Sequence, residues 1–176
     1  LKNFRPIGSL SSKHYYLKNK KSKKVYDLCL VCQLPGAINQ LDYTPRYNHK
    51  FREILKIKVK KSIDQMNLYL SNYCSERNLN IAICLRNQDD NIKFDYEKLF
   101  PKNSKIFQLS SKEINNGKTY EIMSKSKIII GFNTTCVREA WGFNKAIYID
   151  YTGTNLFNEI YNNDMLIIRN QSYDYL

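Results

Sequence analysis

Residues 127–151 constrain the fold of this chain more than any other segment. Their sequence, KIIIGFNTTCVREAWGFNKAIYIDY, begins with an apolar run that stops at Gly131 and continues into a short turn rich in hydroxyl groups. A stretch of helical character follows, ends at Gly142 and leads into a second apolar run. Two apolar strands joined through one helix are typical of a parallel βαβ unit. The segment therefore predicts an α/β fold.

The rest of the chain alternates in the same way. We expect strands at 25–33, 80–85, 105–109, 127–131, 146–151 and 165–168, and helices at 49–73, 119–124 and 155–162. Residues 87–102 are polar around an aromatic patch and are predicted to form a loop, with Asp89 and Asp90 exposed to solvent. Apolar strands that alternate with helices predict a Rossmann-like, mostly parallel sheet with helices on both faces.

Length and composition indicate one domain. A chain of 176 residues, 43% of them hydrophobic, can bury one substantial core. We interpret residues 1–24 as an irregular leading segment and residues 25–176 as a single Rossmann-like domain. No apolar run reaches the roughly 18 residues that a membrane-spanning helix needs. Because the chain begins at Leu1, without a methionine or a signal-peptide pattern, we expect it to be a fragment with a further domain upstream.

The formal net charge is +12, concentrated at residues 18–24 and 56–61. Such a charge favours nucleic acid, anionic lipid head groups or phosphorylated substrates as partners, although lysines that simply face solvent also explain it. On the predicted helix at 49–73, the apolar residues recur every three or four positions. The other side of that helix carries Arg52, Lys56, Lys60 and Lys61. We interpret it as a solvated face, with phosphate or membrane contact as the alternative.

The cysteines do not indicate a metal site. The chain has five, and Cys29 and Cys32 form a C-x-x-C pattern inside a predicted strand. Residues three apart in a strand point to opposite faces, so these two sulfurs should diverge. No second pair stands at zinc-finger spacing, and His14 and His49 are isolated. Buried, reduced thiols of a cytoplasmic protein are the better interpretation.

Polar residues follow the predicted strands at the points where they end. They are Gln33, Arg86, Ser110, Asn133, Thr134 and Asp150. In parallel sheets, ligands bind beyond the carboxyl ends of the strands. The helix after Gly131 would offer free N–H groups to an anion, Thr134 and Thr135 would add hydroxyl donors, and Glu139 could accept from a sugar hydroxyl. Alternatively, Thr134 only caps that helix and Glu139 is an ordinary helix residue.

The segment SKSKIIIGFNTTCVREAWGFNKAIYID at 124–150 resembles the donor-binding half of GT-B glycosyltransferases, most closely those of bacterial surface-carbohydrate (capsule or O-antigen) biosynthesis. UDP-GlcNAc 2-epimerases and CDP-glycerol transferases share this half-fold. YDLCLVCQ at 26–33, PIGS at 6–9 and ICLR at 83–86 extend the resemblance over most of residues 5–151. The chain departs from the family pattern at Asn133, where Ser or Gly is common.

The resemblance implies a nucleotide-sugar site. It assigns the donor phosphates to Thr134 and Thr135 beside Asn133, the ribose hydroxyls to Glu139 and a further phosphate contact to Arg86. It implies sugar transfer without a metal ion or cofactor, from a nucleotide-sugar donor to a glycan or lipid-linked acceptor. A catalytic residue cannot be assigned, because the base usually comes from the N-terminal half. We therefore expect this half alone to be inactive, and the protein to be cytoplasmic, with contact to the anionic inner membrane as a further possibility.

Two other functions stay open. A UDP-sugar 2-epimerase has the same architecture, but would need catalytic carboxylates and a histidine at the cleft between its domains. A basic α/β module that binds nucleic acid would need aromatic side chains among lysines on an exposed face. Tyr15, Tyr16 and the lysines at 18–24 offer only part of that pattern, without a strand platform. Nucleic acid is therefore the less favoured partner.

Overall fold

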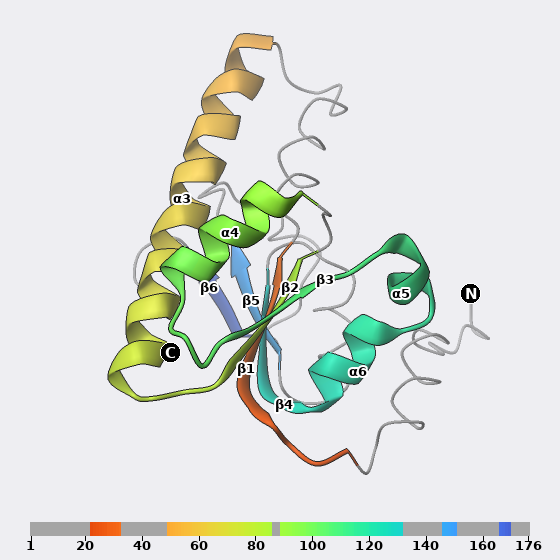
Figure 1. Cartoon of the computed structure of the whole chain (residues 1–176). Coiled ribbons are helices and arrows are strands. Elements are labelled where there is room, and N and C mark those ends of the chain that lie inside the picture. Colours follow the sequence, from red (N-terminus) through yellow and green to blue (C-terminus); the bar gives the residue numbers. More distant parts are fainter. Residues whose placement is uncertain (1–21, 33–48, 86–88, 132–145, 151–165, 170–176) are drawn as a thin grey trace, which may run out of the picture.

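The computed structural model describes residues 22–32, 49–85, 89–131, 146–150 and 166–169. Six strands in this part of the chain form one sheet (Figure 1). They are β1 (Tyr26–Cys32), β2 (Ile81–Leu85), β3 (Lys105–Gln108), β4 (Ser126–Gly131), β5 (Ala146–Asp150) and β6 (Leu166–Arg169). Their order is β3-β2-β1-β4-β5-β6, and every neighbouring pair is parallel. The α/β prediction is confirmed.

Helices cover both faces of the sheet, as predicted (Figure 1). On one face lie α3 (His49–Glu76) and α4 (Asp90–Leu99), and on the other lie α5 (Ser111–Asn115) and α6 (Lys118–Ser124). The side chains of β1 alternate between the two layers, because successive residues of a strand point to opposite faces. Leu28 and Leu30 join the α3 and α4 side, whereas Cys29 and Val31 join the α6 side.

The larger core lies beneath α3 and α4. Ile63, Met66 and Leu70 are at most 4% exposed and pack on the strands at helical spacing. Burial of each such side chain contributes about 1.5–3 kcal/mol to folding. The described buried residues of α3 begin at Ile63, and the N-terminal half of the helix extends beyond the carboxyl ends of the strands (Figure 1).

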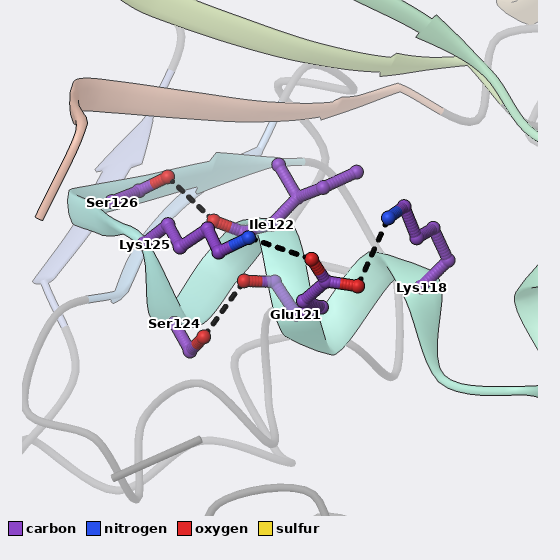
Figure 2. A network of polar contacts seen from close by, with 6 residues as sticks. All are labelled: Lys118, Glu121, Ile122, Ser124, Lys125 and Ser126. Carbon is purple, nitrogen blue, oxygen red and sulfur yellow. Dashed lines mark hydrogen bonds and ion pairs between the residues drawn. The ribbon is translucent and has the colours of Figure 1, made fainter. Parts of the chain in front are cut away.

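Polar contacts fix the junction between α6 and β4 (Figure 2). The Glu121 carboxylate accepts from the ammonium groups of Lys125, at 2.7 Å, and Lys118, at 3.0 Å, and these bonds lower the pKa of Glu121. The Ser126 hydroxyl donates to the carbonyl of Ile122 at 2.9 Å. The Ile122 carbonyl, in the last helical turn, thus gains a side-chain donor in addition to the Lys125 N–H. As a result β4 begins directly after α6 and runs beside β1.

The prediction of a loop at 87–102 is wrong, because residues 90–99 form α4. Asp89 is the N-cap of this helix, and its carboxylate accepts from the Asn91 N–H at 2.9 Å. Tyr96 and Phe100, four residues apart, are buried and stack on one another. Two residues of the supposed aromatic patch, Tyr96 and Phe100, therefore face the core, whereas the third, Phe94, is 53% exposed. Asp89 and Asp90 are exposed, as predicted.

The remaining described elements lie close to their predicted positions. The strands agree within one or two residues, the helix predicted at 119–124 begins one residue earlier, and α3 continues to Glu76. Sequence reasoning missed the short helix α5. Cys29 and Cys32 point to opposite faces, as predicted: Cys29 is buried on the α6 side and Cys32 packs on the α3 side. The helix predicted at 155–162 and most of the leading segment 1–24 lie outside the described residues. The domain boundaries therefore stay predictions.

Candidate functional site

The order in which successive strands are added to the sheet reverses between β1 and β4. The next strand after β1, β2, lies on one side of it, whereas the next strand after β4, β5, lies on the other. From β1 and from β4, the chain thus continues to strands on opposite sides of this pair. In doubly wound sheets a crevice for ligands forms at such a switch point. The carboxyl ends of these two strands are the candidate site.

Gly131 ends β4 at this switch point. It is buried and lies in register between Val31 of β1 and Tyr148 of β5. Ile129 and Ile130, just before it, are at most 1% exposed. Glycine contributes no side chain to pack, and in a strand it often marks a place where a ligand or another backbone approaches closely. The residue type at this position therefore favours close access to the backbone at the carboxyl edge.

The predicted binding residues lie outside the described residues. Arg86 directly follows Leu85, the last residue of β2, and the other predicted residues follow Gly131. Those others are Asn133, Thr134, Thr135 and Glu139. The structure places the strand ends that precede both segments. Cys32 of β1 pairs with Leu85, and Val31 pairs with Gly131, so β2 and β4 flank β1. Two strand spacings, about 10 Å, separate the ends of β2 and β4.

Of the polar groups predicted at the other strand ends, Ser110 has a structural role. It follows β3, is the N-cap of α5 and forms a capping box with Glu113. The Ser110 N–H and hydroxyl both donate to the Glu113 carboxylate, at 2.9 and 2.7 Å, and these bonds lower the pKa of Glu113. The hydroxyl of Ser110 is therefore engaged in local structure. Asp150, at the end of β5, lies in register with Arg169 of β6. Gln33 lies outside the described residues.

One polar cluster at the carboxyl end of β1 was not predicted. The Tyr96 Oη of α4 lies 2.9 Å from the Cys32 Sγ, and it accepts from the Asn67 Nδ2 of α3 at 3.0 Å. Tyr96 and Asn67 are each 5% exposed, and burial raises the pKa of Tyr96. The cluster therefore holds a neutral phenol and ties α3 and α4 to the last residue of β1. Sequence reasoning missed it because it placed Tyr96 in a loop.

Two absences hold for the described part of the chain. In residues 22–32, 49–85, 89–131, 146–150 and 166–169, His, Cys, Asp and Glu side chains do not gather in threes as a metal site would need. Within the same ranges, every helix is too short or too polar to cross a membrane.

Comparison with known proteins adds no relative. Neither a scan against protein-family models nor a search of curated proteins gives a match for this sequence. The fold and the switch point themselves define a doubly wound, Rossmann-like α/β domain.

Proposed function

We propose that this chain is the nucleotide-sugar-binding domain of a glycosyltransferase that acts in bacterial surface-polysaccharide biosynthesis. One observation carries the proposal: β4 ends with Gly131 beside β1, at the switch point of the sheet. The segment N-T-T-C-V-R-E, residues 133–139, begins two positions later in the sequence. A phosphate-binding segment would thus follow the strand end at which doubly wound folds bind their ligands.

Each residue would contact a different part of the donor. N–H groups at the start of the segment after Gly131, together with the hydroxyls of Thr134 and Thr135, would donate to the phosphoryl oxygens. Glu139, about one helical turn later in sequence, would accept from the ribose hydroxyls. Arg86 follows β2, on the other side of β1, and would place a guanidinium against the phosphates.

These groups suit sugar transfer. Breaking the bond between the sugar and its phosphate leaves negative charge on the departing nucleotide. Donors already aimed at that charge lower the barrier, because they need not reorganise as it develops. In this proposal the N–H groups, hydroxyls and Arg86 would supply that stabilisation without a metal ion. A second domain that faces the crevice would supply the catalytic base and would bind the acceptor.

Ligand-induced stabilisation tests the proposal. We expect UDP, CMP, CDP or GDP to raise the thermal midpoint, because a ligand at 100 times its Kd adds about 2.7 kcal/mol to the free energy of unfolding. Glu139→Ala and Thr134→Val, which removes only the hydroxyl, should abolish most of this rise. The control is Glu97→Ala, which removes an exposed carboxylate on α4 that pairs with Lys93 at 3.6 Å.

Two outcomes would contradict the proposal. One is a nucleotide response that persists unchanged in Glu139→Ala and Thr134→Val. The other is stabilisation by single-stranded DNA alone that fades as salt rises, which would indicate a nucleic-acid-binding module.

A further inference from the structure

The side of α3 that faces away from the core is not purely basic. Lys50, Ile54, Ile57 and Lys61 follow one another at spacings of four, three and four residues and therefore lie on one face of the helix. We call these four residues the outward face. Ile54 is 45% exposed and Ile57 is 69% exposed, while both lysines are exposed. Of the residues predicted for the basic side of this helix, only Lys61 belongs to the outward face.

The outward face lies opposite the residues that anchor α3. Ile63, Met66 and Leu70 pack on the sheet, whereas the outward face belongs to the half of α3 that extends past the carboxyl ends of the strands (Figure 1). Fourteen residues of helix, from 49 to 62, are about 21 Å long. Two aliphatic side chains at the projecting end of a well-anchored helix are placed to contact a large partner.

Charge around the two isoleucines indicates the kind of partner. Lys60 and Lys61 are both exposed one turn after Ile57, and Lys50 is exposed one turn before Ile54. The nearby Glu53 carboxylate is paired with the Lys56 ammonium at 2.8 Å. The outward face therefore combines apolar groups with positive charge.

We propose that the outward face of α3 docks on an anionic lipid bilayer. Lysine ammonium groups would contact the phosphates of the head groups, while Ile54 and Ile57 would enter the boundary between head groups and acyl chains. A second copy of this chain fits less well, because the net charge of +12 and the facing lysines would repel it. Nucleic acid would satisfy the lysines but leave both isoleucines in water.

The position of this surface also has a consequence for the candidate site. The projecting half of α3 lies on the side of the sheet to which the carboxyl ends of the strands point (Figure 1). Docking would hold that side close to the bilayer. The inference rests on the residues of α3 alone and stands whether or not the domain binds a nucleotide.

Co-sedimentation with vesicles tests the inference. We expect the 176-residue chain to bind vesicles of phosphatidylglycerol and phosphatidylcholine in equal parts, and to bind pure phosphatidylcholine at least about tenfold more weakly. Ile54→Gln combined with Ile57→Gln should lower the partition coefficient on anionic vesicles about tenfold or more. Lys60→Gln combined with Lys61→Gln should lower it by a similar factor. Glutamine preserves helix propensity, and circular dichroism checks that each variant is folded.

Matched controls separate this surface from general properties of the chain. Val25→Gln removes a side chain that is 53% exposed at the amino-terminal end of β1. Lys102→Gln combined with Lys105→Gln removes two exposed charges near the start of β3. Both controls should bind like the wild type. Three results would overturn the inference. The wild type does not bind anionic vesicles, the isoleucine variant binds as well as the wild type, or the isoleucines mediate a dimer that does not bind vesicles.

Discussion

Tyr96 and Cys32 meet at the carboxyl end of β1, with the phenol Oη 2.9 Å from the thiol Sγ. The contact joins the helix α4 to the strand that borders the switch point. Asn67 of α3 donates to the same phenol oxygen, so one hydroxyl links three elements. Its position beneath the candidate site makes it the first target for mutation.

Tyr96→Phe should destabilise the fold. Loss of the hydroxyl leaves the buried Asn67 amide without this acceptor, and an unsatisfied buried polar group costs about 1–3 kcal/mol. Urea unfolding measures the change. The control is Tyr26→Phe, which keeps the edge-on contact of that ring with Phe107 at 6.2 Å and should shift stability by less than about 0.5 kcal/mol. Equal effects of the two substitutions would contradict the assigned role of Tyr96.

The free energy of unfolding should decrease above pH 9 because of the Cys74 thiol. Burial, and then the nearby Asp27 carboxylate, raises the pKa of this thiol from 9.0 to about 11. Above pH 9 the unfolded thiol releases its proton while the folded thiol keeps it, so the free energy of unfolding falls as pH rises from 9 to 11. Cys74→Ala lacks this thiol, so its deficit relative to the wild type should shrink over that range. Urea unfolding at pH 8, 9, 10 and 11 tests this, and a constant deficit would refute it.

The stabilising contact at the start of β1 should be lost in acid, because it depends on the charged form of Asp27. The Lys127 ammonium, 2.7 Å away, and then the Asn80 N–H, at 3.0 Å, lower the pKa of this carboxyl. The folded state thus favours the charged carboxylate. The contribution of Asp27 to the free energy of unfolding is present above pH 3.8 and is lost as pH falls through the lowered pKa. Asp27→Asn should cost up to about 1 kcal/mol at pH 7.

Chemical denaturation of Asp27→Asn at pH 7 and at pH 3 checks this dependence. The difference from the wild type should be smaller at pH 3. Glu76→Gln serves as the control, because Glu76 forms an exposed pair with Arg77 at 3.4 Å and should matter by less than about 0.5 kcal/mol. A deficit of Asp27→Asn that does not change with pH would show that the charge is not responsible.

The N-cap of α4 offers a separate test of a helix that sequence reasoning missed. Asp89→Ala removes the oxygen that accepts from the Asn91 N–H, and loss of such a cap costs about 1 kcal/mol. Asp95→Ala, at an exposed position in the middle of the same helix, should change stability by less than about 0.5 kcal/mol. Thermal unfolding of both variants gives the comparison, and a larger cost for Asp95→Ala would exclude the capping role.

Sequence reasoning succeeded where the pattern is strong over several residues. The apolar runs around Leu30, Ile83 and Ile130 predicted buried strands, and the spacing of Ile63, Met66 and Leu70 predicted a long helix. It failed at α4, where Tyr96 is the buried residue of the helix and Ile92 and Leu99 are partly buried against the same core. Three apolar residues at spacings of four and three among charged residues make a short pattern that resembles an irregular segment. It becomes distinct once the capping by Asp89 and the contact with Cys32 are known.

The candidate site also combines a prediction from the sequence with a finding from the structure. Its binding residues, the hydroxyls and Glu139 that follow Gly131, are predictions from the sequence. Its location came from the sheet, which puts Gly131 beside Val31 at the switch point. The cluster of Asn67, Tyr96 and Cys32 depends on contacts between residues far apart in the chain. The C-x-x-C pattern that contains Cys32 gives no indication of these contacts.

The sequence by itself determined that this protein is an α/β domain, because the period of its apolar residues records which side chains must avoid water. Only the tertiary structure decided the strand order β3-β2-β1-β4-β5-β6 and thus which strand ends are neighbours. The reason is that backbone hydrogen bonds are alike between any two parallel strands, so a local pattern does not specify the partner. In that order the strands carry α3 and α4 on one face and α6 on the other.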